Sequence, residues 1–232
     1  MTREMLDRNI KTLNDELLIL ESMVKEATLG AVASLIQRDY ETSRQIYADD
    51  RRINRRRFDI ERDCLITIAT QQPIARDLRI LASILEVSSE LERMGDYAKG
   101  IARVNELLGP GPFPATMSDL TGMAEITVGM LGDAMKAFVE YDEEVARRIP
   151  DEDDKVDEFF NKIYHNLVSE MVLNPEIAAR ANHLQWAAHN LERLADRVTN
   201  ICERTIFVVT GEIKELDRTD DEWFQNTKGS GK

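Results

Sequence analysis

The chain has 232 residues, and its 43 acidic against 30 basic side chains give a formal net charge of −13. A charge of this sign argues against a nucleic-acid-binding protein, which needs a basic face. Few glycines and prolines and a low aromatic content are typical of long helices, and no stretch approaches the roughly 18–20 uncharged apolar residues of a membrane span. Cys64 and Cys202 are isolated and no signal peptide opens the chain, so we expect a cytoplasmic protein with reduced thiols.

Apolar residues recur every three or four positions in the first half and predict helices over residues 3–37 and 39–71. A turn is expected at Gln71-Gln72-Pro73, because proline excludes the helical conformation from the residue before it. A third helix is expected over residues 74–108. The segment 109–116 is rich in glycine and proline, cannot continue that helix, and predicts a linker.

The second half repeats this plan, with helices expected over residues 117–149, 151–173 and 176–210. The polar tail, residues 219–232, is expected to be disordered. Together these elements predict an all-α fold of two tandem antiparallel three-helix bundles related by internal duplication. The predicted bundles span residues 1–108 and 117–218.

A short acidic motif, E-R-x-x-D, occurs twice, one hundred positions apart, at Glu92–Asp96 and again at Glu192–Asp196. Spacing of four residues places the two carboxylates of each copy on one helical face, where their like charges repel. Such a pair gives a helix no stability of its own. Its repetition therefore indicates that the carboxylates bind a cation.

A second acidic turn stands about forty residues before each motif, as D-R-R-I-N in the first half and D-D-K-V-D in the second. In each half the turn and the motif are equally far from the hairpin's proline, so antiparallel helices bring them to one height. Four oxygen ligands suit iron, manganese, magnesium or calcium, and suit zinc less well. The predicted metal ligands are Asp50, Asn54, Glu92 and Asp96 in the first half and Asp153, Asp157, Glu192 and Asp196 in the second.

The two copies differ in two places. Gly95 of the first copy is Ala195 in the second, which we expect to widen the helix contact by one methyl group. Asn54 of the first acidic turn is Asp157 in the second, so the first site carries less negative charge. Each motif also has an arginine directly after its glutamate, which we expect to orient a carboxylate.

These motifs, with the segment Q-Q-P-I-A-R-D-L-R-I, resemble the PhoU family over about residues 3–215. The resemblance implies multinuclear metal clusters on the acidic faces, for which we expect iron, with manganese, magnesium, calcium or zinc as alternatives. It also implies a negative regulator of the phosphate-starvation response, which links the ATPase of the Pst phosphate transporter to the sensor kinase PhoR. Such a protein is peripheral to membrane complexes, and a homodimer remains open.

No phosphate-binding loop or nucleophile motif is present, so we expect no enzymatic activity. Two alternatives stay open: a carboxylate-bridged metal oxidase or phosphohydrolase, and a helical scaffold without metal. The three histidines show no H-x-x-x-H or E-x-x-H spacing, which argues against a di-iron oxidase. A basic cluster over residues 51–57 is either a solvated face or a docking site, in which Arg55, Arg56 and Arg57 would contact the partner.

Overall fold

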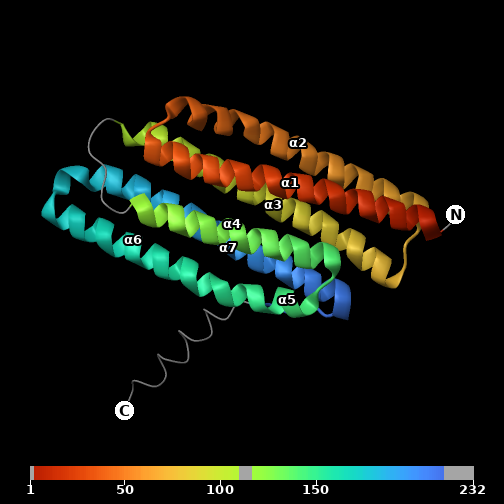
Figure 1. The fold of residues 1–232 in the computed structure, drawn as a ribbon. Coiled ribbons are helices and arrows are strands. Elements are labelled where there is room, and N and C mark those ends of the chain that lie inside the picture. The colour runs from red at the N-terminus through yellow and green to blue at the C-terminus, as the bar shows by residue number, and fades with distance from the viewer. Residues whose placement is uncertain (1–2, 110–116, 217–232) are drawn as a thin grey trace, which may run out of the picture.

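The computed structural model describes residues 3–109 and 117–216, which contain helices and no strands. The first half comprises α1 (Arg3–Gln37), α2 (Tyr40–Gln71) and α3 (Ala75–Leu108); the second comprises α4 (Met117–Glu140), α5 (Glu143–Arg148), η1 (Ile149–Glu152), α6 (Asp153–Leu173), η2 (Pro175–Ile177) and α7 (Ala178–Thr210). Figure 1 shows two groups of long helices with nearly parallel axes, α1–α3 in one and α4, α6 and α7 in the other. The predicted all-α fold of two duplicated three-helix bundles is confirmed.

Parts of the prediction lie outside the described residues. These parts are the linker, apart from Gly109, and the tail over residues 219–232. The bundle boundaries stay a prediction. None of the described helices is both long and apolar enough to span a membrane.

The ends of the first-half helices follow local chemistry. Asp39 caps α2, its side chain accepting hydrogen bonds from the backbone N–H groups of Glu41 (3.1 Å) and Thr42 (3.0 Å). Gln72 ends α2 in the left-handed conformation (φ 49°), directly before Pro73, where the turn was expected. The predicted first, second and third helices are therefore confirmed within a residue or so at each end.

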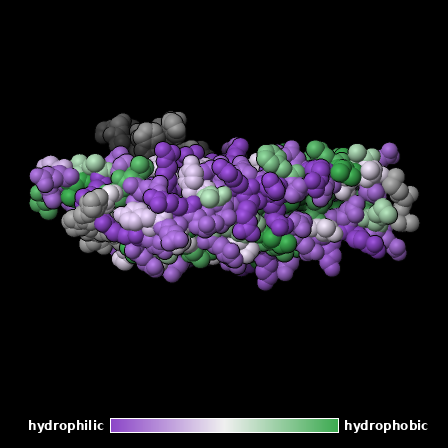
Figure 2. All heavy atoms as spheres, turned by 90° about the horizontal axis from the view of Figure 1, so that it is seen from above, coloured by the Kyte–Doolittle hydropathy of each residue, from purple (hydrophilic) through white to green (hydrophobic). Residues whose placement is uncertain are grey.

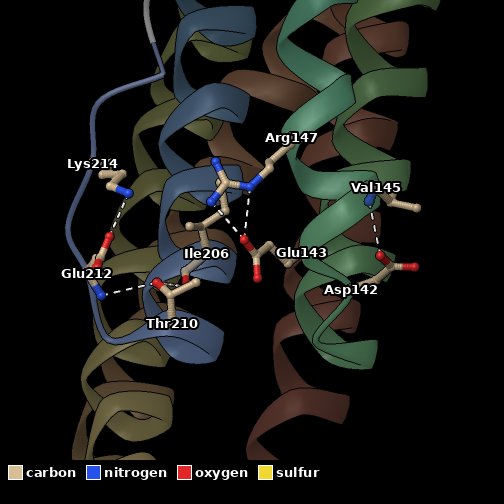
Figure 3. Close-up of polar contacts among 8 residues, drawn as sticks. All are labelled: Asp142, Glu143, Val145, Arg147, Ile206, Thr210, Glu212 and Lys214. Atoms are coloured by element: carbon tan, nitrogen blue, oxygen red, sulfur yellow. Dashed lines mark hydrogen bonds and ion pairs between the residues drawn. The ribbon is translucent and has the colours of Figure 1, made fainter.

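The second half departs from the expected plan, because the single helix predicted over residues 117–149 is wrong. α4 ends at Glu140, Tyr141 adopts the left-handed conformation (φ 57°), and Asp142 caps α5 by accepting a hydrogen bond from Val145 N–H (3.0 Å; Figure 3). The first half makes the same turn at Arg38 (φ 58°) and Asp39. The duplication therefore includes this turn, and α5, η1 and α6 together are the counterpart of α2.

Pro150 explains why that counterpart is broken into pieces. It lies in η1, a short 3-10 segment between α5 and α6, and it has no N–H to donate to the preceding turn. The last helix ends as predicted at Gly211, which is left-handed with φ 80°. Figure 3 shows this end of α7 beside α5, with Glu212 N–H donating to the Thr210 hydroxyl (3.1 Å).

Helices α3 and α7 form the larger contact between the two halves and run antiparallel, and α1 also packs against α4. The Arg79 guanidinium of α3 donates to the Val208 carbonyl at one end of this contact (3.3 Å). Nearer its middle, the buried Glu90 carboxylate accepts from Asn200 (3.3 Å) and lies 3.5 Å from Arg197. Apolar residues of all the long helices belong to one continuous buried cluster. The two bundles therefore share a core.

The face of this elongated molecule that Figure 2 shows is largely hydrophilic. Figure 2 shows one face on which hydrophobic residues form only small, separate patches. Most of the acidic side chains predicted as ligands in the two halves are exposed or half-buried at the edge of the shared core, whereas Asp50 is buried.

Candidate functional site

In the first half, the predicted ligands lie on the facing sides of α2 and α3. Asp50 is buried, with 4% of its surface exposed, and its Oδ2 accepts hydrogen bonds from Asn54 Nδ2 (3.0 Å) and Lys99 Nζ (2.7 Å). Lys99 Nζ also lies 3.6 Å from Asp96 Oδ1. The Lys99 ammonium therefore joins a carboxylate of α2 to a carboxylate of α3.

Glu92 lies close enough to Asp96 and Asp50 for their charges to act on its carboxyl group. Burial raises the pKa of Glu92 above its usual value, and the charges of Asp96 and Asp50 raise it further, while Arg57 opposes them. The other Asp50 oxygen, Oδ1, is buried and accepts no hydrogen bond from the described residues. A buried carboxylate oxygen without a donor is costly, and a cation beside it would lower that cost.

Sequence reasoning missed Lys99, although its place three residues after Asp96 was a signal. The hydrogen bond to Asp50 is the main reason why the pKa of Lys99 is raised, and its ammonium also lies 5.2 Å from the centre of the Tyr47 ring. The corresponding residue of the second half, Thr199, carries no charge. The first acidic site therefore has a lysine ammonium beside its carboxylates, whereas the matching position of the second site has an uncharged threonine.

The first site has donors that suit a hard cation, namely carboxylate and amide oxygens. Within residues 3–109 and 117–216, however, no three acidic, histidine or cysteine side chains converge closely enough to hold a metal ion as placed. The Lys99 ammonium is bound to Oδ2 of Asp50, whereas Oδ1 has no donor among the described residues. The donor chemistry fits a metal, and Oδ1 of Asp50 is the buried oxygen that a cation would satisfy.

In the second half, Asp153 and Asp157 begin α6, while Glu192 and Asp196 lie on α7. The burial of each residue in 91–100 equals that of its counterpart in 191–200, except that Lys99 is half-buried and Thr199 is buried. The Glu192 carboxylate oxygen Oε2 lies 2.6 Å from His189 Nδ1. This histidine is a second residue that sequence reasoning missed, and its signal was H-x-x-E spacing.

The basic cluster is only partly available to a partner. Arg56 forms an ion pair with Glu16 of α1, and Arg57 pairs with Glu61 at 2.7 Å. Arg55 is exposed and has no ion pair with any residue that the structure describes. Of the three predicted contact residues, Arg55 is therefore the one whose charge is directed to solvent.

The arginines of the two motifs do not share one role. Arg93 lies 3.5 Å from Glu90, one turn before it, whereas Arg193 stacks on the ring of Tyr97 across the contact of the two halves (4.8 Å). The expected orientation of a ligand carboxylate is thus replaced, in the second half, by a cation–π contact between bundles.

The two halves of the chain each match a known domain. Residues 17–104 and 120–205 match the family model described as the PhoU domain. A protein of Caulobacter vibrioides named phosphate-specific transport system accessory protein PhoU homolog is 32% identical over 216 residues, which is 90% of this chain and 94% of that protein. A protein of the same name from Aquifex aeolicus is 32% identical over 206 residues, covering 89% and 93% of the two chains.

Solved structures agree with this match. A crystal structure of the phosphate transport system regulatory protein PhoU from Streptococcus pneumoniae has a TM-score of 0.84 and 29% identity, covering 90% of this chain and 99% of that chain. PhoU from Pseudomonas aeruginosa gives a TM-score of 0.83 with 29% identity, covering 89% and 99%.

Proposed function

This chain belongs to the PhoU family, and we propose that it is a regulatory accessory protein of phosphate-specific transport and not an enzyme. The observation that carries the proposal is the match of both halves, at 32% identity over nine-tenths of the chain, to accessory proteins of that transport system. The sequence also supports the proposal, because it contains no nucleophile or phosphate-loop motif, and a protein without catalytic groups acts by contact.

The finer part of the proposal concerns partners. We place the chain at the cytoplasmic face of the membrane, between the ATPase subunit of the phosphate transporter and the sensor kinase PhoR. There it would hold the phosphate-starvation response off when phosphate is plentiful. The exposed Arg55 supports an electrostatically steered contact with an acidic partner surface.

Metal binding is the second part of the proposal. Asp50, Asn54, Glu92 and Asp96 would hold a cation between α2 and α3, and Asp153, Asp157, Glu192 and Asp196 would hold one between α6 and α7. Iron is expected first, with manganese, magnesium, calcium or zinc as alternatives. A bound cation would neutralise carboxylates that otherwise repel one another, and would thereby connect two helices of one bundle.

The regulatory role is tested in cells that lack this chain, with a reporter for the phosphate-starvation response in phosphate-rich medium. Loss of the chain should switch the reporter on, and the wild-type chain should switch it off again. A reporter that stays off without the chain would refute the regulatory role. Phosphate release or oxygen consumption by the purified, metal-loaded protein would favour an enzyme instead.

The metal sites are tested by elemental analysis of purified variants. Glu92→Ala with Asp96→Ala should remove the metal of the first half and leave that of the second. Glu86→Ala is a matched control, because Glu86 is an exposed acid of the same helix outside the acidic site. Metal content that is the same in the double variant and the control would refute the ligand assignment.

A further inference from the structure

A cavity of about 640 Å³ lies where the end of α3 meets α6 and the start of α7. We call it the α3–α7 groove; the residues that matter for its chemistry are Arg103, Phe160, His183, Trp186 and His189. Its walls come from both halves of the chain, so it exists only because the two bundles share a core. It is distinct from the two acidic sites, since none of the eight predicted metal ligands lines it.

Aromatic side chains line the groove, and one of them is well exposed. Trp186 is 41% exposed, although tryptophan is mostly buried in folded proteins. Phe160 of α6 is partly buried and also lines the groove, and its ring centre lies 6.1 Å from that of the His189 ring. Exposed aromatic faces beside an open cavity provide a platform on which a planar ring stacks, and this stacking is worth about 1–3 kcal/mol per base.

The groove also collects positive and hydrogen-bond-donating groups in an acidic protein. No carboxylate of the described residues lines it, although acidic residues outnumber basic ones by 43 to 30 along the chain. Arg103 is exposed, and its guanidinium has neither an ion pair nor a hydrogen bond within the described part of the chain. Two of the three histidines, His183 and His189, lie beside it. Guanidinium and imidazole N–H groups are donors that suit phosphate oxygens.

We propose that the α3–α7 groove binds a nucleotide, with its base stacked on Trp186 and its phosphate oxygens bound by Arg103 and the neighbouring imidazoles. The cavity volume lies within the roughly 300–1,000 Å³ of small-molecule sites. A free phosphate would satisfy Arg103 and leave the rings unused, and a nucleoside would do the reverse. A nucleoside mono- or diphosphate uses both.

The groove has one physical connection to the acidic sites. His189 Nδ1 lies 2.6 Å from the Glu192 carboxylate, so a His189 ring with a proton on each nitrogen would donate to that carboxylate and, from Nε2, to a phosphate in the groove. Nucleotide binding itself requires no metal and no transporter. Its test can therefore fail or succeed independently of the proposed regulatory role.

The test uses the full chain with Trp223→Phe, which leaves Trp186 as its only tryptophan. Tryptophan emission is followed while AMP, ADP, adenosine or inorganic phosphate is added in buffer with chelator. AMP and ADP should quench the emission in a saturable manner, and adenosine and phosphate should each bind at least tenfold more weakly. Calorimetry gives the same dissociation constants without relying on fluorescence.

Arg103→Gln should weaken ADP binding by about tenfold, the loss expected for one charge-assisted contact to phosphate. Arg8→Gln is the matched control, because Arg8 is an exposed arginine of α1 that does not line the groove, and it should leave the affinity unchanged. Trp186→Leu should remove most of the binding measured by calorimetry. Arg103 is exposed, so its substitution keeps the test valid even if Trp186→Leu fails to fold.

Three outcomes would overturn the proposal. The first is the absence of both quenching and binding heat up to millimolar ADP. The second is inorganic phosphate that binds as tightly as ADP, which would show that the rings take no part. The third is equal weakening by Arg103→Gln and Arg8→Gln, which would show a general charge effect and no specific site.

Discussion

The spacing of α2 and α3 at the first acidic site depends on one close contact, between Gly95 and Ile53. Each of these residues lies between the predicted ligands of its own helix. A Cβ added at Gly95 would lie 3.0 Å from Ile53 Cγ2 and 3.1 Å from its Cδ1. Ile53 is buried and β-branched, so its side chain has little freedom to turn away. The absence of a side chain at Gly95 therefore allows the two helices to approach.

The second half makes the corresponding contact between its helices with a different pair of residues. Val156 stands where Ile53 stands in the first half, and Ala195 stands for Gly95; both are fully buried. Compared with the first half, the second half thus has one carbon atom fewer on α6 and one more on α7. The widening that we expected from Ala195 alone is offset by the smaller Val156.

Gly95→Ala should therefore destabilise the protein, although alanine is the better helix former. Overpacking of a buried site costs about 1–3 kcal/mol, and the gain in helix propensity is at most about 1 kcal/mol. A net loss of about 1 kcal/mol corresponds to a fall in Tm of roughly 2–4 °C for a chain of this length. Ile53→Val alone should cost about 0.5–1.5 kcal/mol.

The double variant should recover near wild-type stability, because it reproduces the pairing of the second half. The two changes should then couple by about 2 kcal/mol in a double-mutant cycle, measured by urea and thermal unfolding. Gly129→Ala is the control: a Cβ there meets nothing within 4 Å, so this change should stabilise α4. If Gly95→Ala also stabilises and the cycle is additive, Ile53 yields freely and the contact does not determine the helix spacing.

Three further outcomes are expected. Burial and the charge of Asp96 raise the pKa of Glu92, so the folded protein binds the proton of the Glu92 carboxyl group more tightly than the unfolded chain does. The free energy of unfolding should therefore fall as the pH rises from 4.5, the ordinary pKa, through the raised pKa of the folded state. Glu92→Gln in chelator should thus raise Tm at pH 7 and leave it unchanged at pH 4, by calorimetry; an equal rise at both values would contradict this. Chelation should preserve the helical far-UV signal, since one apolar cluster holds both halves; collapse at room temperature would be inconsistent with that. Arg55→Glu should slow association with the transporter ATPase at low salt without loss of stability. Arg56→Glu should also lower Tm, because it breaks the ion pair with Glu16. An unchanged on-rate for Arg55→Glu would rule that residue out as a contact.

Local patterns in the sequence were sufficient to predict most of the fold. Apolar periodicity, Pro73 and Gly211 located the long helices and their ends, because each acts on the backbone of its own segment. The break at Tyr141 was missed although the signal, an N-cap aspartate, is also local. Repetition of the acidic motif predicted the duplication, since equal spacing along two similar halves requires similar helices.

The candidate sites depended on neighbours that are distant in the sequence. The ammonium of Lys99 on Asp50, the ion pairs of Arg56 and the α3–α7 groove all require two helices to meet at a particular height and rotation. Periodicity shows that a helical face is buried, but burial is non-directional and does not select the element that covers it. The sequence alone therefore determined which side chains lie at each level of a helix. Only the tertiary structure decided which of them meet, because hydrogen bonds and ion pairs act over a few ångströms.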